Sequence, residues 1–275
     1  MSSWVDRFSI KRRRRAKIRQ KPFPSRWSDI IEANVPYFCR LTEAERAEMR
    51  GHIQVFLAEK RFEGCGGLVM TDEIRVTIAA QACLLLLGRD TDYYPDLKTI
   101  LVYPHPFKVH THHRLGIGAI EAGIETHRGE SWSRGDVALA WDEVQRGAGD
   151  IYDGVNLVLH EFAHQLDNES VHGDGAPALP RRSMYIAWAR VLGEEYAHLI
   201  DDVAHHRETV LRAYGATNPA EFFAVTTEAF FEQPIALRGR HPELYEQLMT
   251  FYRQDPASRY TLDGDGSDSE RAHPS

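Results

Sequence analysis

The sequence predicts a helix-rich α+β fold with a small β-sheet in the middle of the chain. Two stretches in the first third carry helix-start signatures followed by apolar residues. Between residues 98 and 141 the pattern changes to short apolar runs that Pro and Gly separate. From residue 153 onward the pattern is helical almost without interruption. We therefore expect one small sheet between two helical regions.

The two N-terminal helices are predicted from their first residues. Thr42 and Glu45 form a capping-box signature, in which each side chain binds a backbone N–H, and the amphipathic stretch continues to about Lys60. Thr71 opens a second, largely apolar stretch that reaches about Leu87. Both stretches are typical of helices that pack against a core.

The sheet is predicted from three short apolar runs, Thr99–Tyr103, Phe107–His110 and Val137–Trp141. The helical pattern of the second half is interrupted by short segments rich in Gly and Pro. The helices are therefore expected near residues 153–168, 180–200, 203–213, 218–232 and 241–252.

Composition limits the class of protein. Of the 275 residues 43% are hydrophobic, which is enough for a folded core, and the net charge is -7. The longest apolar run is shorter than the roughly 20 residues that cross a bilayer, and the N-terminus lacks the apolar stretch of a secretory signal. Three cysteines without a CxxC pair indicate free thiols in a reducing compartment. We therefore expect a cytoplasmic protein without a membrane span.

The positive charge is concentrated near the N-terminus, where eight cationic side chains lie within residues 11–21. Like charges repel and extend a chain, so residues 1–24 are predicted to form a flexible basic arm. The folded domain is predicted at residues 25–258, followed by a disordered acidic tail at 259–275. Because the remainder of the chain is acidic, we do not expect nucleic acid as a partner.

One motif points to metal chemistry. His160, Glu161 and His164 spell HExxH within an apolar stretch. Helical side chains four residues apart have Cβ atoms about 5–6 Å apart, so both imidazoles can reach one ion. Glu161 can then take a proton from the water that zinc activates and pass it to a leaving amine. Unpartnered polar groups would be costly on so apolar a helix, which favours a zinc site over a surface helix.

Zinc requires a third protein ligand, and the sequence leaves several residues open. The HExxHxxGxxH class is excluded, because Asp167 and Ser170 stand where that class has Gly and His. The remaining candidates are glutamates on later helices: Glu194, Glu195, Glu221, Glu228 and Glu232.

The helix pattern does not choose between Glu221 and Glu228. Asn218 is an expected N-cap with Pro219 as the first helical residue, so Glu221 falls at the third position, where a glutamate can close a capping box. Glu228 lies two turns further along the same face. Either carboxylate could therefore complete the metal site.

Several short motifs occur in an order and spacing that are specific when taken together. They are His160-Glu-Phe-Ala-His-Gln-Leu-Asp167, Tyr214-x6-Glu221-Phe-Phe, Phe230-Phe-Glu-Gln-Pro234, Ile100 to Phe107, Gly129-Glu-Ser-Trp132 and Val137 to Trp141. In these motifs the chain resembles the Mlc titration factor A family of bacterial zinc peptidases, over roughly residues 40–255. The resemblance implies a zincin-like fold and a gluzincin site, similar to that of the anthrax lethal factor catalytic domain.

The resemblance also implies a role for each residue of the site. Glu221 becomes the third ligand of one zinc ion per chain, beside His160 and His164. Tyr214 is placed to donate a hydrogen bond to the oxyanion of the tetrahedral intermediate. Some family members carry a histidine ahead of the Ser-Trp pair that reaches the metal, and the matching position here is Glu121, which we expect to be a solvated loop residue.

The expected function is hydrolysis of peptide bonds, aminopeptidase-like on short peptides, with Val137–Trp141 lining the cleft and pairing with an extended substrate. The family is named for titrating a transcriptional repressor of glucose-uptake genes, which implies a role in regulating the glucose phosphotransferase system. The alternative is therefore a regulator that sequesters such a repressor, with catalysis secondary. Glu161 favours the enzyme, because a structural zinc needs four closed ligands and no adjacent base.

Overall fold

The structure is a computed structural model of the chain. It describes residues 4–115, 119–127, 129–132, 135–170, 173–179 and 181–261. Side chains lie outside this description at residues 4–9, 107–134 and 261.

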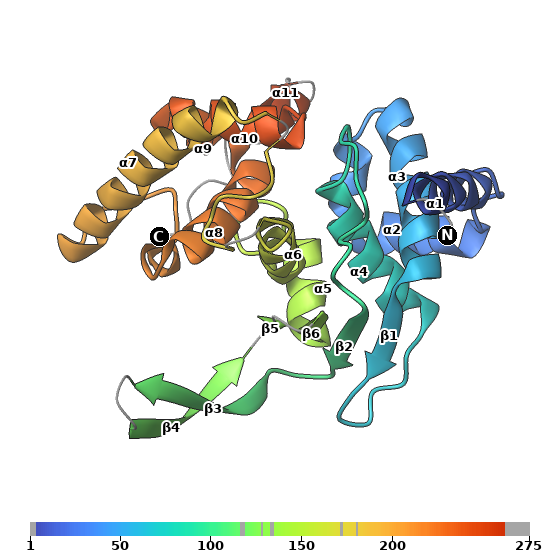
Figure 1. The fold of residues 1–275 in the computed structure, drawn as a ribbon, viewed down its shortest axis with the longest axis horizontal. Helices are drawn as coiled ribbons and strands as arrows, with labels where there is room; N and C mark the ends of the chain where they lie inside the picture. The colour runs from blue at the N-terminus through green and yellow to red at the C-terminus, as the bar shows by residue number, and fades with distance from the viewer. Residues whose placement is uncertain are drawn as a thin grey trace.

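The first third of the chain is helical (Figure 1). Its helices are α1 (Trp4–Arg19), α2 (Ser25–Asn34), the short 3-10 helix η1 (Pro36–Arg40), α3 (Glu43–Glu59) and α4 (Asp72–Leu84). The predicted capping box is present at α3, where the Glu45 N–H donates to the Thr42 hydroxyl and the Thr42 N–H donates to the Glu45 carboxylate at 2.8 Å. Thr71 caps α4 through its hydroxyl. Both helix starts were predictable because their signals are local.

A small mid-chain sheet is present as predicted, but the expected strand at Phe107–His110 is not part of it. Its strands are ordered β1-β2-β6-β5, with β1 (Arg61–Gly64), β2 (Thr99–Tyr103), β6 (Asp136–Ala140) and β5 (Gly129–Trp132). The first three strands run parallel, whereas β5 is antiparallel to β6. The strands β3 (Phe107–Leu115) and β4 (Ala119–His127) form a separate antiparallel hairpin that projects away from the helices (Figure 1).

The strand over Val137–Trp141 was expected to pair with substrate, and this expectation is wrong for β6. Strand β6 has neighbours on both sides, β2 and β5, so its backbone groups are already used within the sheet. Strand β5 is the edge on that side, and it lies against the helix α6 (Leu157–Asp167). The edge strand of the sheet beside α6 is therefore β5 and not β6.

The second half is helical as predicted and confirms the helix-rich α+β fold. Besides α6 it contains α5 (Trp141–Gly149), α7 (Met184–Ala204), η2 (Ala213–Ala216), α8 (Pro219–Glu232), α9 (Pro234–Arg240), α10 (Pro242–Tyr252) and α11 (Pro256–Thr261). The helix expected at 203–213 is not formed, since α7 ends at Ala204 and His206 has the left-handed φ of 52°. No helix among the described residues is both long and apolar enough for a transmembrane span.

Buried aromatic side chains fix α6 in the body of the molecule. The Phe162 ring is fully buried and lies 5.7 Å from the Phe56 ring and 4.9 Å from the Tyr94 ring, between ring centroids. This contact holds one face of α6 against α3 and the segment that leads to β2. The opposite face of α6 is therefore directed toward α8, which packs against it (Figure 1).

Part of the predicted basic arm is the helix α1, which packs along α3. The Arg15 guanidinium lies 2.7 Å from the Glu59 carboxylate and 2.6 Å from that of Asp92, and Lys11 lies 2.8 Å from Asp92. These ion pairs join the arm to acidic groups of the body. The division of the chain into arm, domain and tail stays a prediction, and residues 262–275 of the expected tail lie outside the described residues.

Glu169, just after α6, gives the stability of the fold an expected pH dependence. Burial raises the pKa of Glu169 from 4.5 to about 7, and the charge of Arg89 opposes the rise only in part. The unfolded chain therefore releases this proton before the folded chain does, so stability should fall as the pH rises from 4.5 to 7. Glu169→Gln should abolish this loss and stabilise the protein at pH 8 by about 1–3 kcal/mol.

Urea unfolding of both proteins at pH 4.5 and pH 8 measures this difference. The matched control is Glu246→Gln, a change at an exposed position of α10. A Glu169→Gln protein whose stability relative to the native protein is the same at both pH values would contradict the prediction.

Candidate metal centre

The start of α6 is fixed by Asn156, and this places His160 one turn into the helix. The Asn156 side-chain oxygen accepts a hydrogen bond from the Leu159 N–H at 3.0 Å. Its amide nitrogen donates to the Gly147 carbonyl and to the Glu232 carboxylate, both at 3.0 Å. A side chain at position 147 would lie within 3.0 Å of the Asn156 Cα, so the glycine permits this close approach.

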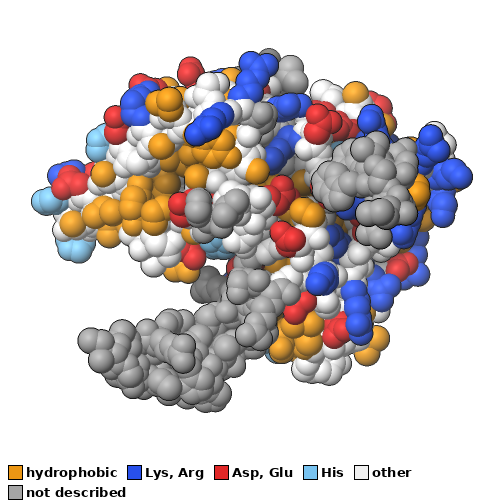
Figure 2. Space-filling view, in the orientation of Figure 1, with side chains coloured by type: hydrophobic (Ala, Val, Ile, Leu, Met, Phe, Trp, Pro, Cys, Tyr) orange, Lys and Arg blue, Asp and Glu red, His pale blue; other side chains and the backbone are white. Residues whose placement is uncertain are grey.

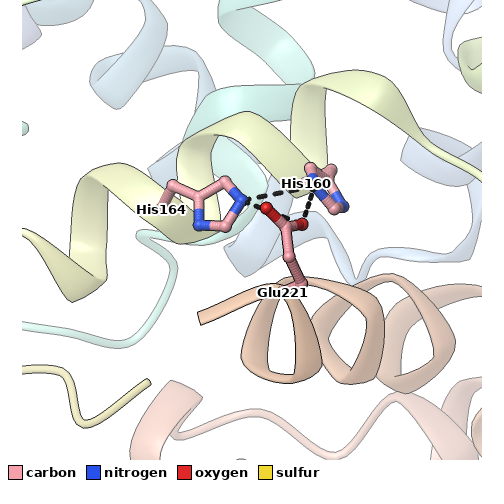
Figure 3. Close-up of side chains that lie close together, drawn as sticks. All are labelled: His160, His164 and Glu221. Atoms are coloured by element: carbon pink, nitrogen blue, oxygen red, sulfur yellow. Dashed lines mark hydrogen bonds and ion pairs between the residues drawn. The ribbon is translucent and has the colours of Figure 1, made fainter. Parts of the chain in front are cut away.

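The start of α8 places Glu221 opposite that turn. The Asn218 side chain accepts a hydrogen bond from the Glu221 N–H at 2.9 Å, and Pro219 occupies the first helical position. This is one half of the expected capping box. The Glu221 carboxylate points across to the two histidines of α6 (Figure 3). The cap therefore holds the backbone in place while the side chain is directed into the site.

Three ligand atoms converge between α6 and α8 (Figure 3). The Glu221 Oε2 atom lies 3.0 Å from His160 Nε2 and 3.4 Å from His164 Nε2, and the two Nε2 atoms are 3.3 Å apart. One ligand atom from each of these three residues lies within 4.8 Å of the others, and no other such group of potential metal ligands occurs among the described residues. Two histidines and a glutamate are a donor set that zinc accepts.

The polar atoms of this cluster fit a bound cation. Glu221 Oε2 is buried and accepts no hydrogen bond of good geometry from the described residues, although both imidazoles are close. Burial disfavours the charged forms of His160 and of Glu221. Nevertheless Glu221 and Glu228 raise the pKa of His160 to about 10, and the imidazoles hold the pKa of the Glu221 carboxyl well below its usual range. The site thus stabilises positive charge among these side chains.

Glu161 and Tyr214 lie beside the cluster. Glu161 is 4% exposed on α6, next to His160 in sequence. Tyr214 lies in η2 with 52% exposure, and its ring centroid is 5.9 Å from that of His160. Burial raises the pKa of Tyr214 to about 12, with further contributions from the Glu221 and Glu161 charges. The phenol is therefore protonated at neutral pH and able to donate a hydrogen bond.

Glu228 lies behind His160 and not among the converging ligand atoms. Its Oε1 atom is 2.8 Å from His160 Nδ1, and its Oε2 atom accepts a 2.6 Å hydrogen bond from the Asn156 N–H. Arg212 also forms an ion pair with this buried carboxylate. A carboxylate on Nδ1 fixes the imidazole so that Nε2 presents its lone pair to a metal.

The other glutamates considered as metal ligands lie away from the converging ligand atoms. Glu194 pairs with Arg190 at 3.0 Å, and Glu195 lies 2.7 Å from His241. Glu232 bonds to Asn156 as described, and burial raises its pKa well above the usual range. The backbone of Glu121 lies in β4 opposite His113, but its side chain lies outside the described part of the chain.

Asn156 and Arg212 are site residues that the sequence reasoning missed. Asn156 precedes the HExxH helix at a position where an N-cap is common, so a local signal for it exists. Arg212 has no such signal, because its contact with Glu228 joins segments that only the fold brings together.

Comparison with known proteins agrees with this geometry. The profile of the glucose-regulated metallo-peptidase M90 family matches residues 9–253. The chain belongs to this family. An M90 protein is a metallopeptidase, and its activity implies a bound metal ion, for which the His-His-Glu cluster is the candidate site.

Several relatives of this M90 chain are similar over most of their length. An uncharacterized protein of Synechocystis sp. is 40% identical over 244 residues, which are 88% of this chain and 89% of the relative. The Mlc titration factor A proteins of Yersinia pestis and Yersinia pseudotuberculosis are each 32% identical over 240 residues, 86% of both chains. The resemblance drawn from the motifs is thereby confirmed. The M90 match also begins within α1, so it includes most of that helix.

Proposed function

We propose that the protein is a gluzincin-type zinc peptidase that hydrolyses peptide bonds, aminopeptidase-like on short peptides. The observation that carries this proposal is the convergence of His160, His164 and Glu221 within 4.8 Å, next to the buried Glu161. Imidazole and carboxylate ligands suit zinc, and three protein ligands leave a position open, as in catalytic zinc sites.

The side chains divide the chemistry among them. Zinc held by the three ligands would act as a Lewis acid and lower the pKa of its water toward neutrality. Glu161 accepts the proton of the attacking water and later passes it to the leaving amine. The Tyr214 phenol donates a hydrogen bond to the oxyanion of the tetrahedral intermediate. Glu228 keeps the His160 ring oriented during these steps.

A peptide-library cleavage assay tests this proposal. We expect the zinc-loaded protein to cleave peptides, to lose this activity after treatment with a zinc chelator, and to regain it when zinc is added back. Removal of single N-terminal residues would support the aminopeptidase assignment, whereas internal cuts would replace it with an endopeptidase. Cleavage that is unchanged after the metal has been removed would contradict a zinc mechanism.

A regulatory role is a second candidate function. The family description mentions glucose regulation, and the Yersinia relatives are named for titrating Mlc. We propose as the alternative that this chain sequesters a transcriptional repressor and thereby acts on the glucose phosphotransferase system. Its free cysteines Cys39, Cys65 and Cys83 suit a cytoplasmic location, where such a partner would be found. Binding of a purified repressor by the Glu161→Gln protein would separate this role from catalysis.

A further inference from the structure

A basic groove lies on the side of the molecule that α1 forms with α3, α4 and β1. Its volume is about 1110 Å³. Figure 2 shows Lys and Arg side chains gathered over this part of the molecule. Six exposed cationic side chains line the groove, with Asp72 as the one acidic residue among the described lining: Arg13, Arg14, Lys17, Lys21, Arg61 and Arg75.

The charge in the groove is not needed to dock α1. Helix α1 is joined to the body by Lys11 and Arg15, which pair with Asp92 and Glu59. Of these six exposed cations, Arg61 pairs with Glu63 at 2.6 Å, whereas the other five have no ion pair within the described part of the chain. Several like charges around one hollow repel each other, so an anionic ligand would stabilise them.

The wall of the groove includes the start of β1, at Arg61 and Phe62. Within the described part of the chain, β1 pairs only with β2. The Arg61 N–H donates to the Lys98 carbonyl at 3.0 Å, and just after the strand the Cys65 N–H donates to the Val102 carbonyl at 2.8 Å. Alternate residues of a strand direct their backbone groups to opposite edges, so Phe62 directs its N–H and C=O away from β2. Phe62 lines the groove, and its backbone groups have no partner among the described residues.

We propose that this groove binds an extended acidic segment of a partner protein, which adds to β1 as a further strand. Backbone groups of the segment pair with Phe62, and its carboxylates meet the cations of α1. Arg13 and Lys17 lie one helical turn apart on α1, and both line the groove, so neighbouring carboxylates of the segment have cations within the same hollow.

A peptide fits the groove better than single-stranded nucleic acid does. Nucleic-acid grooves combine cations with aromatic faces on which bases stack. Here both aromatic side chains of the lining are partly buried in edge-to-face pairs, Trp27 with Phe23 at 5.7 Å and Phe62 with Phe56 at 6.2 Å. The groove therefore offers backbone groups and charge more readily than stacking surfaces.

The groove is separate from the metal centre. Its residues lie on α1, α2, α3, α4 and β1 and in the segments between them, whereas the converging ligands lie on α6 and α8. The proposal goes beyond the proposed function and does not require catalysis. It identifies a docking site that would hold a partner or a protein substrate by an acidic segment.

Fluorescence anisotropy with synthetic peptides tests the docking site on the full-length protein. The probe is a labelled peptide of alternating glutamate and valine, compared with one of alternating lysine and valine. We expect only the acidic peptide to bind, and Arg13→Glu/Lys17→Glu to weaken it by about tenfold or more. The control is Arg181→Glu/Arg182→Glu, an equal change of charge at two exposed positions outside the groove, which should change affinity less than twofold.

Backbone N-methylation of the peptide tests the added strand without altering the protein. One probe is methylated at every glutamate and another at every valine, and the two sets of N–H groups point to opposite edges of a strand. We expect one of these probes to lose affinity about tenfold and the other to bind like the unmodified peptide. If both methylated probes bind like the unmodified peptide, or if both lose affinity equally, strand addition would be overturned.

Two further results would also overturn the proposal. One is binding of the acidic peptide that survives Arg13→Glu/Lys17→Glu while circular dichroism shows the fold intact. The other is tighter binding of an oligothymidylate than of the peptide at the same ionic strength, if the same variant also abolishes that binding. This result would assign the groove to nucleic acid.

Discussion

Glu161→Gln is expected to lower kcat for peptide hydrolysis by about 10²–10⁴-fold. The amide has nearly the same shape as the carboxylate but cannot accept a proton from water. Glu161 is 4% exposed and adjacent to His160, so an isosteric change is needed to keep the helix packed. Zinc content should stay near one per chain, because Glu161 is not among the converging ligand atoms. Steady-state cleavage kinetics and metal analysis of the same sample measure both quantities.

The control for this change is Glu194→Gln, which alters an exposed glutamate of α7 that pairs with Arg190. That protein should retain its turnover. If Glu161→Gln keeps the turnover of the native protein, Glu161 is not the general base. If it loses zinc as well as activity, the residue acts in metal binding.

Glu221→Gln is expected to weaken zinc binding more than Glu228→Gln does. The two changes are chemically identical and lie seven residues apart on α8. Glu221 presents Oε2 to both Nε2 atoms, whereas Glu228 contacts only the Nδ1 side of His160. Loss of an outer partner typically costs about 10–100-fold in metal affinity, and loss of a direct ligand should cost more.

Competition with a chromophoric zinc chelator measures both affinities. Thermal unfolding of the metal-free proteins shows whether either change acts through stability, which matters because Glu228 is buried and also bonds to Asn156 and Arg212. The reverse order of affinities, with Glu228→Gln the weaker binder, would make Glu228 the ligand and refute the assignment of Glu221.

Much of the fold could be predicted because its signals are local. Thr42 and Asn218 cap the helices that follow them, and an N-cap acts through backbone groups within three residues. The run Thr99–Tyr103 is strand β2 with the predicted bounds. The HExxH spacing likewise depends only on helical geometry, and the structure brings His160 and His164 together as that geometry requires.

The rest depends on contacts between distant segments. Glu221 and Glu228 share a face of α8, so only the placement of α8 against α6 decides which carboxylate meets Nε2 and which meets Nδ1. The helix α1 was unexpected because its charge is offset by Glu59 and Asp92, which are remote in sequence. Strand β1 was missed because four residues beside a helix end give too short a pattern.

The ion pair between Arg212 and Glu228 connects the His160 ring with the segment that carries Tyr214. Arg212 precedes Tyr214 by two residues, so the carboxylate that orients His160 also anchors the loop that carries the tyrosine. Thermodynamic linkage is reciprocal: if metal loading orders this loop, then ordering the loop must tighten the hold on the metal by the same factor. A ligand that orders this loop by contact with Tyr214 would then raise the affinity of the site for its ion, even without touching the ion.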